Sequence, residues 1–325
     1  MIRLAEFLPP EPSLLWDLAR QAGVESAVAG LPLPSDCLPG ESPWDHGPLE
    51  RMRDRYAAAG FRIDVIEARP PLNLAKRGLP GGDAEVETVC TLIENMGRLG
   101  IPVWCYEWMA DFNWLRTRTD APSRGGSVVT AYDHQEMEAR GISSNGPLSE
   151  DLLWATLTRF LERVLPVAEK AGVRLAMHPD DPPRSPIRGV GRIMRSIENF
   201  ETLLAISRSP MHGICLCQGN FALMTDDLPA AIRRLGAAGK IFFVHFRDVV
   251  GDVDNFEEAW HDAGKTDMVA CMRAYKDIEF DGALRPDHVP TVSGDSNADA
   301  GYSAYGRLYA LGYIRGLRES MLAEK

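Results

Sequence analysis

Four short apolar segments each begin directly after a glycine that closes a helical pattern. The segments read AAAGFRIDV, GRLGIPVWC, EKAGVRLAM and GAAGKIFFV, with the closing glycines at positions 60, 100, 172 and 239. Glycine readily adopts the left-handed backbone conformation that follows the last turn of many helices. Helices that end in this way and lead at once into an apolar strand predict a fold in which strands and helices alternate.

The alternation extends over the whole chain. Predicted strands span 2–7, 25–31, 62–68, 102–109, 174–178, 213–217, 241–247 and 283–287. Helical patterns lie near 11–22, 47–59, 83–99, 148–171, 196–208, 227–238, 266–278 and 303–322. Eight strands that are each followed by a helix predict an α/β fold, a closed (β/α)8 TIM barrel. A doubly wound sheet is the main alternative, but no GxGxxG turn follows the first strand.

A chain of 325 residues has room for two average domains or one large barrel. No shift in composition marks a boundary, so we expect a single barrel domain over 1–325. The connection 110–147 after the fourth strand is too long for a simple loop and carries Phe112, Trp114 and Tyr132. We expect it to be a partly ordered lid, and the segment 249–265 is a second, smaller lid candidate.

Composition and charge exclude several classes of partner. The net charge of −11 argues against binding to nucleic acid or to anionic membranes, while an anionic small substrate remains compatible with a few well-placed arginines. The N-terminus does not resemble a signal peptide, and no apolar run is long enough for a membrane helix. Six scattered cysteines do not form a disulfide framework, so we expect a cytoplasmic protein.

Metal-ligand residue types end four successive predicted strands. The fifth strand ends at His178, the sixth at Cys217, the seventh carries His245, and the eighth carries Asp287. Active sites of such barrels lie at the carboxyl ends of the strands. Imidazole, thiolate and carboxylate are the usual donors to divalent metals. The pattern therefore predicts a metal site formed by these four side chains.

Arginines accompany two of these ligands. Arg247 lies two residues after His245, and Arg285 lies two residues before Asp287, so strand periodicity places each arginine on the same face as its ligand. A guanidinium in that position is suited to bind a substrate carboxylate through two hydrogen bonds.

Each of these residues also has an ordinary structural interpretation. A single histidine at a strand end is more often a hydrogen-bonded structural residue, and a single cysteine is more often a small buried apolar group. Asp287 also fits a turn that pairs with Arg285, and Arg247 fits a salt bridge at the rim. Their shared position at the ends of adjacent strands favours the metal site.

Other candidates have less support. His261 fits an exposed helical position better than a ligand. Cys215 shares a face with Cys217 and is expected to pack deeper in the barrel. Asp180 and Asp181, between prolines, are expected to form a rigid loop behind His178 and to accept hydrogen bonds there.

Seven stretches, spread in order over most of the chain, resemble the mannonate dehydratases, which belong to the xylose-isomerase-like TIM-barrel group. The stretches are GLPGGD (78–83), GIPVWCYEWMADFNW (100–114), AMHPDDPPR (176–184), CQGNF (217–221), VHFRDV (244–249), RPDH (285–288) and GYSAYGRLYALGYIRGL (301–317). The combination of HPDDPP, RPDH and GYSA is specific, whereas each motif alone is weak.

The resemblance implies an Mn²⁺-dependent enzyme that converts D-mannonate to 2-keto-3-deoxy-D-gluconate and water during hexuronate breakdown. It implies that His178, Cys217, His245 and Asp287 bind the metal. It also implies that His288 and Tyr302, together with Asp287, take part in catalysis. The manganese assignment comes from the resemblance alone, because a thiolate ligand ordinarily favours softer ions such as zinc.

The matching motifs also contain Asn220 and Trp114, which we expect to contact the substrate together with Arg247 and Arg285. The expected partner is a small sugar acid, and the sequence leaves homo-oligomerisation open. A metal-dependent isomerase or epimerase of the same barrel group is the alternative function. A barrel that only binds sugar acids is a third, disfavoured because binding alone requires no proton-transfer residues.

Overall fold

The computed structural model describes residues 2–323. Within this range, eight parallel strands close into a barrel in the order β1-β12-β9-β8-β7-β4-β3-β2. These strands are β1 (Arg3–Leu8), β2 (Ser26–Ala29), β3 (Arg62–Ile66), β4 (Val103–Tyr106), β7 (Arg174–Met177), β8 (His212–Cys217), β9 (Ile241–His245) and β12 (Ala283–Arg285). The predicted (β/α)8 barrel is therefore confirmed.

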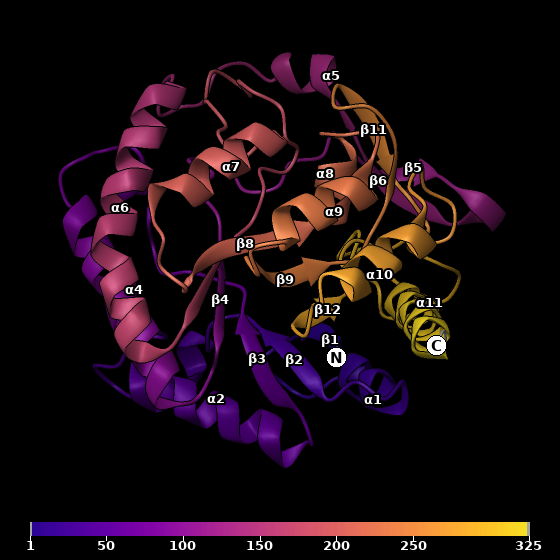
Figure 1. Ribbon diagram of the computed structural model, residues 1–325, viewed down its shortest axis with the longest axis horizontal. Helices are drawn as coiled ribbons and strands as arrows, with labels where there is room; N and C mark the ends of the chain where they lie inside the picture. The colour runs from indigo at the N-terminus through magenta and orange to yellow at the C-terminus, as the bar shows by residue number, and fades with distance from the viewer. Residues whose placement is uncertain (1, 324–325) are drawn as a thin grey trace.

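A long helix follows each barrel strand and packs on the outside of the barrel (Figure 1). These helices are α1 (Leu14–Gln21), α2 (His46–Ala58), α4 (Gly82–Arg98), α6 (Glu150–Ala171), α7 (Ile197–Ile206), α9 (Leu228–Gly236), α10 (Met268–Asp277) and α11 (Ala304–Ala323). Shorter helices lie in the connections: η1 (Pro34–Asp36), α3 (Asn73–Lys76), η2 (Arg124–Gly126), α5 (His134–Glu138) and α8 (Gln218–Ala222).

The glycines that close the helical patterns adopt the predicted backbone conformation. Their φ angles are 87° at Gly60, 70° at Gly100, 70° at Gly172 and 65° at Gly239. A positive φ at these positions ends the helix and turns the chain toward the next strand, at little steric cost because glycine has no Cβ.

Several barrel strands are shorter than predicted at their carboxyl ends, whereas β8 ends at Cys217 as predicted. β7 stops at Met177, one residue before His178, and β12 stops at Arg285, two residues before Asp287. The residues expected to end these strands therefore lie in the first positions of the following loops. Side chains in such positions point into the mouth of a barrel, where function is usually found.

The two inserted segments are not plain loops, because they join in one antiparallel sheet beside the barrel. This outer sheet has the order β10-β11-β6-β5, and its strands are β5 (Arg118–Pro122), β6 (Val128–Asp133), β10 (Val249–Gly251) and β11 (Asn255–Glu258). Pairing of β11 with β6 connects the segment after β4 to the segment after β9. Aromatic stacking supports the pairing, since the rings of Tyr132 and Phe256 lie 5.6 Å apart.

Apolar side chains fill both the barrel and the layer between barrel and helices. The interior cluster contains small or β-branched residues such as Ala5, Val28 and Val65, which suit the narrow centre of an eight-stranded barrel. Among residues 2–323, no helix is both long enough and apolar enough to cross a membrane.

Candidate active site

A cavity of about 550 Å³ opens at the carboxyl ends of the barrel strands. Its wall contains the predicted site residues Trp114, His178, His245, Arg285, Asp287, His288 and Tyr302. Further polar groups in the wall are Glu67, Arg69, Glu107, Asn113, Asp181, Asp299 and Arg307. The volume falls within the range of pockets that enclose small organic ligands.

The structure brings the four predicted metal ligands together. His178 Nε2 lies 3.2 Å from His245 Nδ1, and the Cys217 Sγ lies 3.7 Å from Asp287 Oδ2. His245 Nδ1 is also 3.5 Å from the same Asp287 oxygen. The donor atoms of His178, Cys217 and His245 all lie within 4.8 Å of one another. Donors this close, at or just after the carboxyl ends of four barrel strands, could hold a single ion.

The surroundings of these side chains fit a divalent ion. Pro179 O lies 2.7 Å from His178 Nδ1, so we place the ring proton on Nδ1, which leaves the Nε2 lone pair free to face the other ligands. Burial opposes ionisation of Asp287, but nearby His288, Arg285 and His245 hold the pKa of its carboxyl well below the usual range. An ionised carboxylate, two imidazoles and a thiol are a common donor set for such ions.

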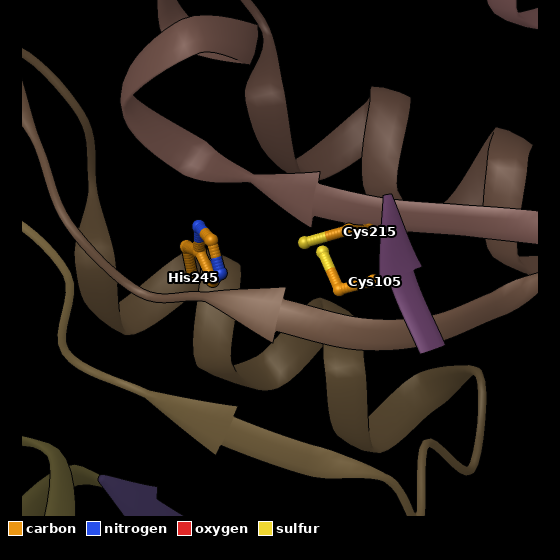
Figure 2. Close-up of side chains that lie close together, drawn as sticks. All are labelled: Cys105, Cys215 and His245. Carbon is orange, nitrogen blue, oxygen red and sulfur yellow. The ribbon is translucent and has the colours of Figure 1, made fainter. Parts of the chain in front are cut away.

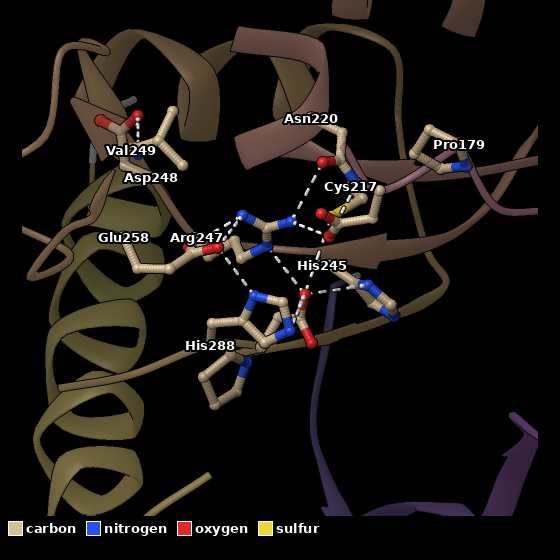
Figure 3. A network of polar contacts seen from close by, with 12 residues as sticks. Pro179, Cys217, Asn220, His245, Arg247, Asp248, Val249, Glu258 and His288 are labelled. Carbon is tan, nitrogen blue, oxygen red and sulfur yellow. Dashed lines mark hydrogen bonds and ion pairs between the residues drawn. The ribbon is translucent and has the colours of Figure 1, made fainter. Parts of the chain in front are cut away.

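Arg247 binds protein carboxylates rather than facing the cavity. Its side chain is fully buried and is not among the described residues that line the cavity wall. Its guanidinium donates to Asp287 Oδ2 at 2.8 Å and to Asp181 Oδ2 at 2.7 Å. It also donates to both carboxylate oxygens of Glu258, at 2.9 and 3.0 Å, a contact drawn in Figure 3. The arginine predicted to bind substrate therefore holds the candidate ligand Asp287 in place from the side away from the cavity.

Arg285 does face the cavity, although its guanidinium is already shared. It donates to both carboxylate oxygens of Glu67, at 2.9 and 3.1 Å, and lies 3.0 Å from Asp287 Oδ1. Arg69 and Arg307 are further cations in the wall. Sequence analysis did not identify these two as site residues, although Arg69 directly follows the predicted strand 62–68 and Arg307 lies in the matching stretch 301–317.

Asn220 and Trp114 have different positions relative to the cavity. Asn220 is fully buried in α8, where it donates to Asp181 at 3.3 Å and accepts from Arg247 at 3.3 Å. It is not among the described residues that line the cavity. Trp114 forms part of the wall, and its ring lies 5.0 Å from that of His288.

His288 and Tyr302 form a hydrogen-bonded pair in the cavity wall. His288 Nε2 lies 3.0 Å from the Tyr302 hydroxyl, and its Nδ1 lies 2.9 Å from Glu258 Oε1. Because an ionised carboxylate only accepts hydrogen bonds, we place the His288 proton on Nδ1 and let Nε2 accept from Tyr302. Burial raises the pKa of the Tyr302 phenol well above its usual range, so this hydroxyl holds its proton until it meets a base.

Glu258 and Arg116 are site residues that the sequence analysis missed. Both come from the inserted segments, and Arg116 donates to Asp181 at 2.6 Å and to Glu258. Burial opposes ionisation of Glu258, but the neighbouring Arg247, His288 and Arg116 lower the pKa of its carboxyl to about 2. Alternation in the sequence NFEE, where Phe256 and Glu258 face inward, is the signal that marks Glu258 as buried.

One expectation about nearby residues is wrong, and a second is met only in part. His261 is fully buried in a turn rather than exposed on a helix, and its ring lies 6.5 Å from that of Tyr313 on α11. Asp180 and Asp181 accept hydrogen bonds, as expected, but none of these comes from His178: Asp180 accepts from the backbone of Met194 at 2.6 Å, and Asp181 binds Arg116 and Arg247. A buried carboxylate is destabilising unless a cation pairs with it, so these acids need their arginine partners. Cys215 packs in the barrel interior, as predicted.

Comparison with known proteins agrees with this geometry. A family model described as D-mannonate dehydratase (UxuA) matches residues 8–145 and 142–325. Mannonate dehydratase 2 of Halalkalibacterium halodurans is 33% identical over 305 residues, covering 86% of this chain and 88% of that protein. The mannonate dehydratase of Streptococcus suis is 33% identical over 325 residues, covering 92% and 87%.

Solved structures extend the comparison. The crystal structure of mannonate dehydratase from Streptococcus suis serotype 2 has a TM-score of 0.87 and 31% identity, and covers 99% of this chain and 93% of that one. A D-psicose 3-epimerase from Clostridium cellulolyticum, with a TM-score of 0.62 and 12% identity over 98% of this chain and 99% of that one, shares the fold alone. The chain therefore belongs to the D-mannonate dehydratase family of carbon–oxygen lyases.

Proposed function

We propose that this chain is a metal-dependent dehydratase that converts D-mannonate to 2-keto-3-deoxy-D-gluconate and water, with Mn²⁺ as its ion. One observation carries the proposal: the four ligand side chains and the His288–Tyr302 pair line or adjoin a single cavity. A sugar-acid dehydratase needs metal ligands, because a bound ion stabilises the negative charge that develops on the substrate. It also needs an acid–base pair, because two protons must move.

The metal would be held by His178, Cys217, His245 and Asp287. When bound, a divalent ion acts as a Lewis acid that stabilises the negative charge developing beside the substrate carboxylate, worth several kcal/mol. Hydrogen bonds with neighbouring protein groups hold the ligand side chains in position. Arg247 fixes Asp287 at 2.8 Å, and the Pro179 carbonyl fixes the His178 ring at 2.7 Å.

The His288–Tyr302 pair would carry out the proton transfers. Dehydration takes a proton from C2 and releases the C3 hydroxyl as water, so one group accepts a proton and another donates one. His288 Nε2 would accept the C2 proton, and Tyr302 would give its hydroxyl proton to the departing C3 hydroxyl, which leaves as water. Transfer of the proton from His288 back to Tyr302, across their 3.0 Å contact, would then restore both groups. Acid–base catalysis of this kind contributes about 10²–10⁴ in rate.

Cations and aromatic groups in the wall suit an anionic sugar. Arg69, Arg285 and Arg307 line the cavity and would attract the substrate carboxylate despite the net charge of −11 on the whole chain. Trp114 covers His288 and Tyr302, with ring centroids 5.0 and 6.3 Å away, and would exclude water from the acid–base pair.

The proposal is tested with purified protein that is stripped of metal by a chelator, reloaded with Mn²⁺, and supplied with a panel of aldonates. D-Mannonate should yield a product that is positive in a 2-keto-3-deoxy acid assay. Activity should require added metal and should be lost in Cys217→Ala with retention of the folded circular dichroism spectrum. Cys271→Ala is the matched control, because that buried cysteine lies in α10, away from the cavity wall.

Absence of keto acid from every aldonate would overturn the dehydratase proposal. Interconversion of stereoisomers or of an aldose–ketose pair in the same panel would then support the isomerase or epimerase alternative. Binding of sugar acids without any turnover would support a barrel that only binds its ligand.

A further inference from the structure

A second group of metal-ligand residues lies next to the candidate metal site, deeper in the barrel. It consists of Cys105 on β4, Cys215 on β8 and His245 on β9, whose donor atoms all lie within 4.8 Å of one another. Figure 2 shows the two sulfur atoms pointing toward each other, with the imidazole beside them. Cys215 precedes the ligand Cys217 by two residues on the same strand, so it faces the same side of the strand one step lower.

We propose that Cys105, Cys215 and His245 form a second cation site, which takes a thiophilic divalent ion such as zinc. Two thiolates at the usual zinc–sulfur distance of about 2.3 Å lie roughly 3.8 Å apart at a tetrahedral angle. The three donor atoms are already within 4.8 Å of one another, so small side-chain adjustments would complete the coordination. The fourth position would be left to water.

The two ring nitrogens of His245 differ in their partners. Nδ1 faces the first site, at 3.2 Å from His178 Nε2 and 3.5 Å from Asp287 Oδ2. Nε2 is buried and makes no hydrogen bond of good geometry with the described residues, although Glu67 Oε1 lies 3.2 Å away. A buried ring nitrogen without a well-directed partner is costly, and a cation held with the two thiols would satisfy it.

Charge balance favours a divalent ion at this position. Each thiol would release its proton on binding, and two thiolates with one divalent cation carry no net charge. A neutral group is compatible with the apolar surroundings, where Cys105 and Cys215 pack with Ala5, Val28 and Val65. Thiolates also select soft ions over manganese, which prefers oxygen ligands.

An ion can reach this site from the active-site cavity. Cys105 contributes to the cavity wall, and the structure records all six cysteines as free thiols. We call the group of Cys105, Cys215 and His245 the lower site, and the candidate metal site of His178, Cys217, His245 and Asp287 the upper site. Because His245 belongs to both, a soft ion in the lower site would bind the same imidazole ring that the upper site uses. This goes beyond the proposed function: it predicts that thiophilic ions bind the protein beside the candidate catalytic metal site, at a position that shares only His245 with it.

Cadmium is the probe, because its bonds to thiolates absorb in the ultraviolet. In metal-free Cys217→Ala protein, which lacks the thiol of the upper site, we expect one equivalent of Cd²⁺ to bind with thiolate–cadmium absorption. When Cys105→Ala or Cys215→Ala is combined with Cys217→Ala, the protein should no longer bind this equivalent of Cd²⁺, and the thiolate–cadmium absorption should disappear. Adding Cys271→Ala instead should leave both unchanged, because Cys271 belongs to neither group.

Cys105→Ser serves as a second, nearly isosteric variant, and circular dichroism checks that each protein is folded. Absence of the absorption in Cys217→Ala overturns the proposal. Persistence of the absorption without Cys105 and Cys215 also overturns it, and points to the more exposed Cys37 and Cys90. The titration contains no mannonate, so its outcome is independent of whether the protein is a dehydratase.

Discussion

Glu257 and Glu258 are neighbours in sequence with different surroundings. Glu258 is buried against Arg247 and His288, whereas Glu257 is partly exposed on the opposite face of β11. In Glu258→Gln the shape is kept, but the charge that holds the His288 Nδ1 proton is lost. We expect kcat to fall about 10–100-fold, as for other groups that orient a functional histidine.

The matched control for this residue is Glu257→Gln, which should keep full activity. Both variants should retain bound metal, measured by elemental analysis, since neither carboxylate is a predicted ligand. Equal activity in Glu258→Gln and the unmodified protein would show that His288 does not depend on Glu258 for its orientation.

At the scale of elements, the outer sheet delivers functional groups to the barrel. Phe256 on β11 is buried between the ring of Tyr132 and the guanidinium of Arg116, whose centre lies 4.9 Å from the Phe256 ring. Truncation of a buried phenylalanine typically costs about 3–5 kcal/mol. In Phe256→Ala we therefore expect the outer sheet to loosen and activity to fall, because Glu258 and Arg116 lose their fixed positions.

Hydrogen exchange measures this effect by region. Amides of 118–133 and 249–258 should exchange faster in Phe256→Ala, while those of the barrel strands keep their protection. Val250→Ala is the control in the same sheet, since Val250 is exposed on β10. Uniformly faster exchange across the barrel strands would show that the outer sheet and the barrel unfold as one unit.

For the whole molecule, buried carboxylates set the response to acid. Burial opposes ionisation of Glu107, yet Lys76 and Arg69 lower its pKa to about 2 from 4.5. Glu67 and Glu258 are likewise lowered to about 2 by neighbouring cations. Because the folded pKa lies below the unfolded value, the stabilisation is complete above about pH 4.5 and is lost as the pH falls toward 2.

We therefore expect the Tm to decline steeply below about pH 4.5, as measured by circular dichroism from pH 7 to pH 3. Glu107→Gln should lower the Tm at pH 7, because it leaves Lys76 buried without its carboxylate, and should make the acid decline shallower. The exposed Glu169→Gln should change neither. An unchanged acid slope in Glu107→Gln would contradict this account.

The barrel, and the convergence of four candidate ligand side chains at its mouth, could be predicted because local patterns encode them. Four strands follow a glycine because the left-handed conformation of that glycine ends the preceding helix. Strand ends in a closed barrel converge at one face, so His178, Cys217, His245 and Asp287 were identified as candidates from their positions. The outer sheet was not predicted, because β5 and β11 are short, and their pairing through β6 joins segments more than a hundred residues apart.

Sequence by itself determined the order of the barrel strands and of the helices that follow them, and the residue types at the barrel mouth. Only the tertiary structure decided what those residues contact. Arg247 binds Asp181 and Glu258 instead of facing the cavity, because the fold encloses it with these carboxylates, and a buried guanidinium requires charged partners. These partners lie in segments that are distant in sequence. They come together only when the barrel closes and its insertions pack, and local periodicity does not encode that contact.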